Sequence, residues 1–416
     1  MTAGVAGRSS LFESRDFRRL WLGQTVSLLG TQVTFIALPL TAIEVLHAPL
    51  REIGILAALQ FLPYVVFGLP TGALVDRLQR RTVMLVTNVM LAASLAAVPV
   101  ASAAGLLSMP LLYVVAFAAG SLTMTFELAY TSYLPILVRR DLLLAANSRL
   151  EVSRAMAQIS GATVGGVLIA LVSAPFAIAV DAASYLAAAL MIATMRHREE
   201  PRQREAASRL WTEISSGVRF VVGHNLIRTI ALVAALDNLL LSAQGALFIP
   251  YLARNLDLDP TLIGVAVAAG SLGGLAGAVG LPRLARRWGA WRSIVAAQMA
   301  MLIAILLLPL ASAVAAAALL FVVVSGLGFG VSRVVLMVSM GTLRQQLTPD
   351  DLQGRVAAAV RLIGVGTIPV GAALGGFSGE WIGLPATFVA CGVGFLLPLG
   401  LVLNARSLTG EPAPAL

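Results

Sequence analysis

The 416-residue sequence predicts an all-α membrane protein whose twelve transmembrane helices form two parallel-related six-helix bundles. Three observations predict this fold class: the composition, an internal repeat and the lengths of the uncharged segments. The chain is 58% hydrophobic, with a mean hydropathy of +0.90, which is more apolar surface than a soluble core can bury. We therefore expect the hydrophobic segments to lie in lipid.

The chain repeats itself at an offset of 210 residues. At this offset Asp141 falls on Asp351, and Ile53-Gly54 falls on Ile263-Gly264. Two halves inserted in the same direction, with a site between them, are the architecture of many secondary transporters. The predicted domains are a bundle at 1–195, a cytoplasmic linker with an amphipathic helix at 196–224, and a second bundle at 225–416.

Segments without charge define the spans in chain order, because about 20 apolar residues cross roughly 30 Å of hydrocarbon. Residues 83–126 contain no Asp, Glu, Arg or His and are interrupted at 105–110, which predicts two crossings and a tight turn. Residues 293–332 repeat this pattern in the second half. The predicted spans are 19–46, 53–75, 83–104, 109–134, 151–172, 175–195, 227–252, 261–283, 293–311, 313–342, 356–378 and 382–404.

The basic residues predict the orientation. All are Arg, and they cluster before the first span and after each even-numbered span. By the positive-inside rule, both termini are cytoplasmic, so we expect a multi-pass protein of the plasma (inner) membrane. The net charge of +9 then reflects topology and contact with anionic membrane lipids, and it does not indicate nucleic-acid binding.

The residues that are missing exclude several kinds of chemistry. Without Lys there is no Walker A phosphate loop, so the chain cannot be a P-loop ATP-driven pump. The single cysteine, Cys391, and the three histidines have no metal-ligand spacing. We expect no metal, no cofactor, no catalytic residues and no enzymatic activity, and a monomer.

The most specific local motif follows the second predicted span and runs from Gly72 to Arg81, with Asp76-Arg77 and Arg80-Arg81 inside it. It resembles the signature loop of the major facilitator superfamily. That resemblance implies a cytoplasmic gating motif in which Asp76 holds the two halves together. We expect its partner at 348–351, with Thr348 as N-cap and Pro349 at the first helical position. The alternative is a topology anchor. The second half has Leu284 in place of the aspartate, so only the first half carries the acidic residue.

A second resemblance covers most of the chain. Residues 141–166 and 351–356 are similar to macrolide-efflux and enterobactin-exporter members of the same superfamily. Residues 161–166 also resemble the fifth-helix glycine motif of antiporters, with Ala162 where a proline is usual. The helix-packing glycines expected from this motif and its repeat are Gly161, Gly165, Gly166, Gly371, Gly375 and Gly376.

Ionisable side chains inside spans are costly, so they usually face a cavity or a partner. Glu127, Asp237 and Arg333 lie in the fourth, seventh and tenth spans, and the resemblance implies that these spans line the cavity. One hypothesis is that Glu127 or Asp237 exchanges protons, tuned by Arg333. The alternative is a structural ion pair.

Polar residues form a stripe along the first span. Gln24, Ser27, Thr31 and Thr34 recur at helical spacing, and the offset places Ser27 and Thr34 on Asp237 and Gln244. Together with Asn238, we expect these side chains to line a proton and substrate pathway. The alternative is that the hydroxyls bond to their own helix. Asp181 in the sixth span is expected to be structural or to face the mouth of the cavity.

The sequence and its resemblance together favour a secondary active transporter. We expect a proton-coupled exporter of amphipathic small molecules, such as a drug, a macrolide or a siderophore-like compound, that works by alternating access. Its partners are then a small-molecule substrate, protons and membrane lipids. Two alternatives remain open: an importer of a nutrient or metabolite, and a non-transporting membrane receptor or scaffold on the same fold.

Overall fold

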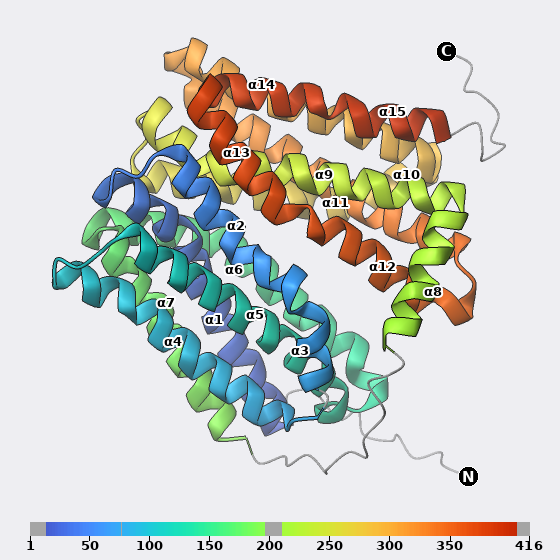
Figure 1. The fold of residues 1–416 in the computed structure, drawn as a ribbon, viewed down its shortest axis with the longest axis horizontal. Coiled ribbons are helices and arrows are strands. Elements are labelled where there is room, and N and C mark those ends of the chain that lie inside the picture. Colours follow the sequence, from blue (N-terminus) through green and yellow to red (C-terminus); the bar gives the residue numbers. More distant parts are fainter. Residues whose placement is uncertain (1–13, 76, 196–209, 406–416) are drawn as a thin grey trace, which may run out of the picture.

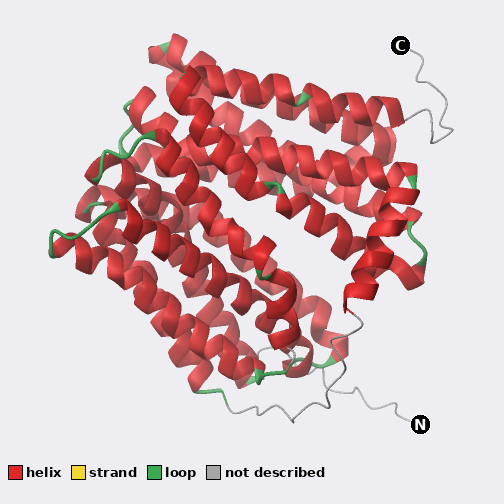
Figure 2. Ribbon diagram, viewed as in Figure 1, coloured by secondary structure: helices red, strands yellow, loops and turns green. Residues whose placement is uncertain are grey.

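The computed structural model describes residues 14–75, 77–195 and 210–405, and within them every regular element is helical (Figure 2). This confirms the predicted all-α fold class. Residues 196–209 of the linker predicted at 196–224 lie outside the described residues. Eleven of the described helical segments are long and apolar enough to cross a membrane.

The helices form two bundles that lie side by side (Figure 1). The first bundle contains α1 (Arg15–Leu40), α2 (Leu50–Val66), α3 (Gly68–Val75), α4 (Arg80–Ala103), α5 (Met109–Leu137), α6 (Leu143–Val172) and α7 (Ala174–Ala193). The second contains α9 (Asn225–Pro250), α10 (Pro260–Ala313), α11 (Ala318–Leu347), α12 (Gln353–Gly366), α13 (Ile368–Ile382), α14 (Leu384–Gly394) and α15 (Leu396–Ala405). Below, they are the N bundle and the C bundle.

Several spans are broken, and a proline follows each of three breaks by two or three residues. The predicted second span consists of α2 and α3, which are separated at Phe67 ahead of Pro70. This is the one predicted span that no continuous candidate covers. Equivalent breaks separate α12 from α13 and α14 from α15, because a proline removes one helical hydrogen bond and its ring clashes with the carbonyl four residues before it. In α10 the chain turns at Gly289, whose φ of 76° suits glycine.

The two bundles repeat each other in backbone detail. His47 and Asp257, which the offset pairs, both have positive φ, at 49° and 50°. Ser173 and Gly383 form a second such pair, with φ of 72° and 86°. The π-helical turns Thr41–Val45 and Tyr251–Asn255, which prolong α1 and α9, also correspond. Because such backbone features recur in register, the repeat read from the sequence is also a repeat of structure.

The bundles meet at the end of the molecule opposite the start of α1 and the end of α15, called here the distal end. Their ribbons diverge toward the other end, called here the terminal end (Figure 1). Two crossings of glycines join them. A Cβ at Gly54 of α2 would lie 2.6 Å from the Cα of Gly376 in α13. A Cβ at Gly264 of α10 would lie 3.2 Å from the Cα of Gly166 in α6. The offset converts one crossing into the other, so the contact between the bundles has twofold pseudosymmetry.

Helix α8 (Leu210–Gly223) precedes the C bundle and packs on it. Val221 is buried in a cluster with Val356, Ala359 and Val360 of α12. The sequence predicted an amphipathic helix within 196–224, and α8 lies in this range. Part of its apolar face contacts the hydrophobic surface of α12.

Candidate functional site

A tyrosine of the N bundle interacts both with a carboxylate of its own bundle and with a guanidinium of the C bundle. The phenol of Tyr64 in α2 donates a hydrogen bond to Oε2 of Glu127 in α5, with an oxygen–oxygen distance of 3.3 Å. Arg361 in α12 interacts electrostatically with the same Tyr64. Acid, phenol and base therefore form one group that spans the two bundles.

Arg361 is the site residue that the sequence reasoning missed. It lies inside the predicted span 356–378, so the criterion that selected Glu127 applies to it as well. Its side chain is exposed, and it makes no hydrogen bond or ion pair with another described residue. A guanidinium that is always protonated is available there to interact with an anionic or polar group.

Asp237 and Arg333 lie together, within the C bundle. Nε2 of Gln298 in α10 donates to both carboxylate oxygens of Asp237 in α9, at 3.1 and 3.0 Å. Nη2 of Arg333 in α11 donates to Oδ1 of Asn238 at 3.3 Å, and its charge also acts on Asp237. The structure therefore brings Asp237, Asn238 and Arg333 together and places Glu127 in the other bundle.

Gln298 is a second polar residue that the sequence reasoning did not select. It is fully buried, and Asp237 is 4% exposed. The offset pairs Gln298 with Asn88, which is also a buried polar residue inside a span. A search for uncharged polar residues repeated between the halves would have found it.

The polar stripe of α1 faces α7 of its own bundle. Oγ1 of Thr34 donates to Oδ2 of Asp181 at 2.5 Å, and Oγ of Ser184 donates to Oδ1 at 3.1 Å. Thr31 donates to the carbonyl of Ser27 at 2.9 Å and lies 3.0 Å from the hydroxyl of Tyr185. Both the expected bonding to the own helix and a contact with a neighbouring helix therefore occur. The carboxylate of Asp181 has a structural role here.

The remaining two residues of the predicted pathway have different surroundings. Gln24 is half-buried near the terminal end of α1. Gln244 in α9 is buried, and its Oε1 has no hydrogen-bond partner among the described residues.

The two halves fill equivalent positions with different chemistry. The offset places Ser27, Asn88 and Thr123 on Asp237, Gln298 and Arg333. In the N bundle these three positions carry no charge, and the hydroxyl of Tyr185 interacts with Ser27, Thr123 and the nearby carboxylate of Asp181. In the C bundle the same positions hold an acid and a base. The fold therefore does not need charges here, which makes the pair in the C bundle a functional candidate.

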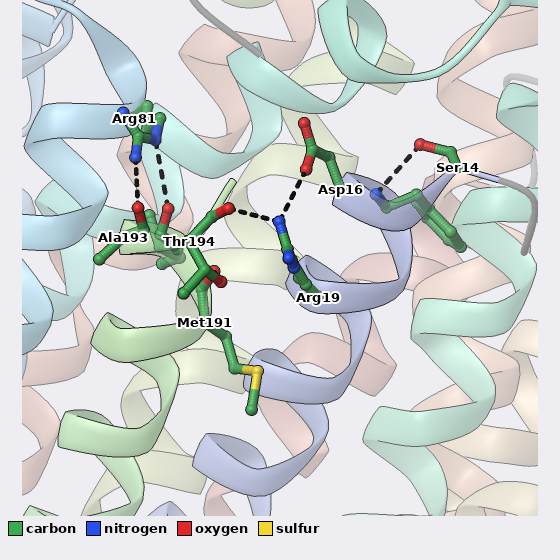
Figure 3. Close-up of polar contacts among 9 residues, drawn as sticks. Ser14, Asp16, Arg19, Arg81, Met191, Ala193 and Thr194 are labelled. Carbon is green, nitrogen blue, oxygen red and sulfur yellow. Dashed lines mark hydrogen bonds and ion pairs between the residues drawn. The ribbon is translucent and has the colours of Figure 1, made fainter. Parts of the chain in front are cut away.

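The predicted gating motif has one member, Asp76, outside the described residues. Arg80 is buried at the start of α4, Arg77 is exposed, and a Cβ at Gly72 would meet nothing within 4 Å. Arg81 donates to the carbonyl oxygens of Ile192 and Ala193, at 3.2 and 2.7 Å (Figure 3). Arg81 therefore caps the C-terminus of α7.

Arg19 of α1 contributes to the same cap. It donates to the carbonyl of Thr194 and forms an ion pair with Asp16, with a nitrogen–oxygen distance of 3.5 Å (Figure 3). Cations at a helix C-terminus satisfy its last carbonyls and interact favourably with its dipole. The two arginines thus hold the ends of α1, α4 and α7 together at the terminal end.

The expected helix start at 348–351 is wrong by one residue. Pro349 is the N-cap of a short 3₁₀ turn, Asp350–Leu352, that leads into α12. Oγ1 of Thr348 donates backward to the carbonyl of Arg344 at 2.7 Å, so it satisfies the end of α11. The misassignment arises because a threonine between two helices can bond in either direction.

Arg81→Ala is expected to lower the free energy of unfolding by about 1 kcal/mol, since it removes two charge-assisted hydrogen bonds at a solvent-accessible helix end. Thermal unfolding of the purified protein in detergent measures this change. Arg77→Ala is the matched control and should leave the unfolding temperature unchanged. Equal unfolding temperatures for both variants and the parent would contradict the capping role of Arg81.

The six expected packing glycines all lie at close helix approaches. Gly161 and Gly165 lie against α1 of their own bundle, and Gly371 and Gly375 lie against α9. Gly166 and Gly376 form the crossings between the bundles. In both α6 and α13, two glycines contact a helix of the same bundle, and the glycine that follows them contacts a helix of the other bundle.

Comparisons with known proteins agree with this architecture. A sequence model of the Major Facilitator Superfamily matches residues 20–369. The chain is 28% identical over 386 residues to the multidrug efflux pump Tap of Mycolicibacterium fortuitum. The aligned region covers 90% of this chain and 91% of the pump.

Solved structures share the fold. A bacterial homologue of the iron transporter ferroportin, in an inward-facing state, aligns with a TM-score of 0.76 at 18% identity, over 96% of this chain and 100% of that one. The nucleoside transporter NupG aligns with a TM-score of 0.74 at 12% identity, over 95% of this chain and 100% of that one. At these identities the likeness establishes the fold alone.

Proposed function

Because the chain belongs to the major facilitator superfamily and is a multi-pass membrane transporter, we propose that it is a proton-coupled exporter of amphipathic small molecules that works by alternating access. The similarity to the multidrug efflux pump Tap supports export as the direction of transport. The expected resemblance to drug-efflux members of the superfamily is confirmed.

One observation carries the coupling: the group of Glu127, Tyr64 and Arg361 contains an acid from one bundle and a base from the other. Rocking of the bundles changes the distance between the guanidinium and the carboxylate. Because Tyr64 interacts with both Glu127 and Arg361, movement of one bundle against the other changes the surroundings of this carboxylate. In this proposal Glu127 exchanges a proton in step with the conformational change, as coupled transport requires.

The C-bundle group is the second part of the proposed pathway. Asp237, Asn238 and Arg333 combine an acid, an amide and a base, whereas the positions equivalent to Asp237 and Arg333 in the N bundle are uncharged. In this proposal the group binds a polar part of the substrate or a second proton, and apolar side chains around it accept the rest of an amphipathic molecule.

We propose that the protein lies in the plasma membrane as a monomer. Both termini and the Arg-rich loops then face the cytoplasm. The distal end is then external, and the structure is closed on that side. Asp76, Arg77 and Arg80 are proposed to act as a cytoplasmic lock in the opposite state, with the acidic turn at 350–351 as their partner. In the conformation of the present structure, the ribbons of the two bundles diverge at the terminal end (Figure 1).

Glu127→Gln is expected to abolish transport driven by a proton gradient while substrate binding persists, because the amide keeps the hydrogen bond of Tyr64 and cannot exchange a proton. Uptake of ethidium into inverted vesicles under an imposed proton gradient measures transport, and thermal stabilisation by ethidium measures binding. Glu151→Gln is the control, since Glu151 is exposed and pairs only loosely with Arg154, at 3.8 Å.

Each outcome discriminates between functions. Gradient-driven uptake by the parent with loss in Glu127→Gln supports the proposal. Undiminished uptake by Glu127→Gln removes this acid from the mechanism. Ethidium movement out of the inverted vesicles would indicate an importer, and binding without any flux would indicate a receptor or scaffold.

A further inference from the structure

At the distal end two side chains of the C bundle bind backbone groups of the N bundle. Oε2 of Glu380, near the end of α13, accepts a hydrogen bond from the backbone nitrogen of Leu50 at 2.9 Å. Nη2 of Arg254, in the π-helical turn after α9, donates to the carbonyl of Ala48 at 2.7 Å. The two side chains also attract each other electrostatically. The connection between α1 and α2 is therefore held at two points by the other bundle.

The start of α2 requires a cap that its own sequence does not supply. Its N-cap residue is Pro49, which makes no side-chain hydrogen bond. The first amide groups of a helix have no partner within the helix, so an acceptor must come from elsewhere. Glu380 supplies that acceptor from the other bundle, and its negative charge suits the positive end of the helix dipole.

The equivalent helix start in the second half is capped differently. There the offset replaces Pro49 with Asp259, whose Oδ1 accepts from the backbone nitrogens of Thr261 and Leu262, at 2.8 and 3.2 Å. The offset also replaces Glu380 with Ala170, which has no acceptor. Only one of the two symmetric helix starts is thus capped across the bundles.

We propose that Glu380 and Arg254 form a distal latch, a helix cap supplied in trans that exists only while the distal ends of the bundles are together. The latch adjoins the glycine crossing, because Gly54 follows Leu50 by one helical turn and Gly376 precedes Glu380 by one turn. Separation of the bundles breaks both hydrogen bonds at once. Glu380 and Arg254 are exposed, so water replaces the lost partners and the latch biases the conformational equilibrium without locking it.

This inference goes beyond the proposed function, and its test needs no substrate. Nitroxide labels at Leu106→Cys and Val314→Cys, exposed residues of distal connections in the two bundles, report the distal separation by electron–electron double resonance. The background variant Cys391→Ala removes the native thiol. Glu380→Ala and Arg254→Ala are each expected to raise the ratio of long to short distances by about three- to tenfold, where tenfold corresponds to about 1.4 kcal/mol.

A charge swap separates a helix cap from a simple ion pair. In the double variant Arg254→Glu, Glu380→Arg, the opposite charges remain adjacent. The arginine at position 380 has only donors, so it cannot accept the hydrogen bond from the backbone amide of Leu50. We expect the swapped protein to stay shifted toward long distances. Restoration of the parental distances would overturn the cap.

Two further variants complete the test. Asp257→Asn removes a carboxylate from the same distal face, at a φ of 50° that Asn tolerates, and should leave the distances unchanged. Glu380→Gln keeps an acceptor of the same length and should fall between the parent and Glu380→Ala. Unchanged distances in both alanine variants, or a glutamine variant as shifted as the alanine variant, would refute the latch.

Discussion

Replacing Gly54 or Gly376 with alanine is expected to open the distal end and to stop transport. A Cβ at Gly54 would lie 2.6 Å from the Cα of Gly376 and 2.8 Å from the carbonyl oxygen of Ala372. A Cβ at Gly376 would lie 2.7 Å from the Cα of Gly54. These neighbours are backbone atoms, so the helices themselves must move apart. Overpacking of this kind costs about 1–3 kcal/mol, which would lower the distal-closed population about 5- to 150-fold.

The distal labels described above measure the opening, and ethidium flux in vesicles measures the functional loss. Gly245→Ala in α9 is the matched control, since a Cβ there would meet nothing within 4 Å. Alanine should be tolerated at that position and should favour the helix by about 0.5–1 kcal/mol. Parental distances and parental flux in the Gly54 and Gly376 variants would contradict the role of the crossing.

These crossings show how far the sequence could predict the fold. The offset paired Gly166 with Gly376 and Gly54 with Gly264, and the spacing of the glycines predicted close helix contact. The sequence did not indicate that Gly54 meets Gly376, or that Gly166 meets Gly264, across the bundles. A repeat relates equivalent positions, whereas the partner of each position depends on how the two copies are arranged in space.

Hydropathy located the spans but not their breaks or extensions. The predicted second span is divided at Phe67, ahead of Pro70. Average hydropathy does not detect the hydrogen bond that a proline removes from a helix. Helix α6 begins at Leu143, eight residues before the predicted 151, because Asn147, Ser148 and Arg149 interrupt the apolar segment without ending the helix. Helices can continue past the lipid, so the apolar length sets a minimum.

The site was predicted less completely than the fold. Periodicity correctly placed Ser27, Thr31 and Thr34 on one face of α1, but it could not show that this face contacts α7. Asp237 and Arg333 came from charge alone and lie together, whereas Glu127 has another partner. Glu380 could not be recognised from its sequence position, because its cap depends on a contact between bundles.

Replacing Asp237 with alanine is expected to destabilise the C bundle by about 1–3 kcal/mol, the usual effect of leaving a buried hydrogen-bond donor without its acceptor. Asp237 is 4% exposed, and its loss leaves Gln298, which is fully buried, without its acceptor. The half-buried guanidinium of Arg333 loses a counter-charge as well. Thermal unfolding in detergent, with the parent measured alongside, gives the change in stability.

The N bundle supplies the rescue. Asp237→Ser with Arg333→Thr copies Ser27 and Thr123, which occupy the equivalent positions without charge. Because both charges leave together, the double variant should recover most of the stability that Asp237→Ala loses. A double variant as unstable as the single one would show that the halves are not interchangeable here. In the folded double variant, loss of gradient-driven ethidium flux assigns the pair to transport, and retained flux assigns it to structure.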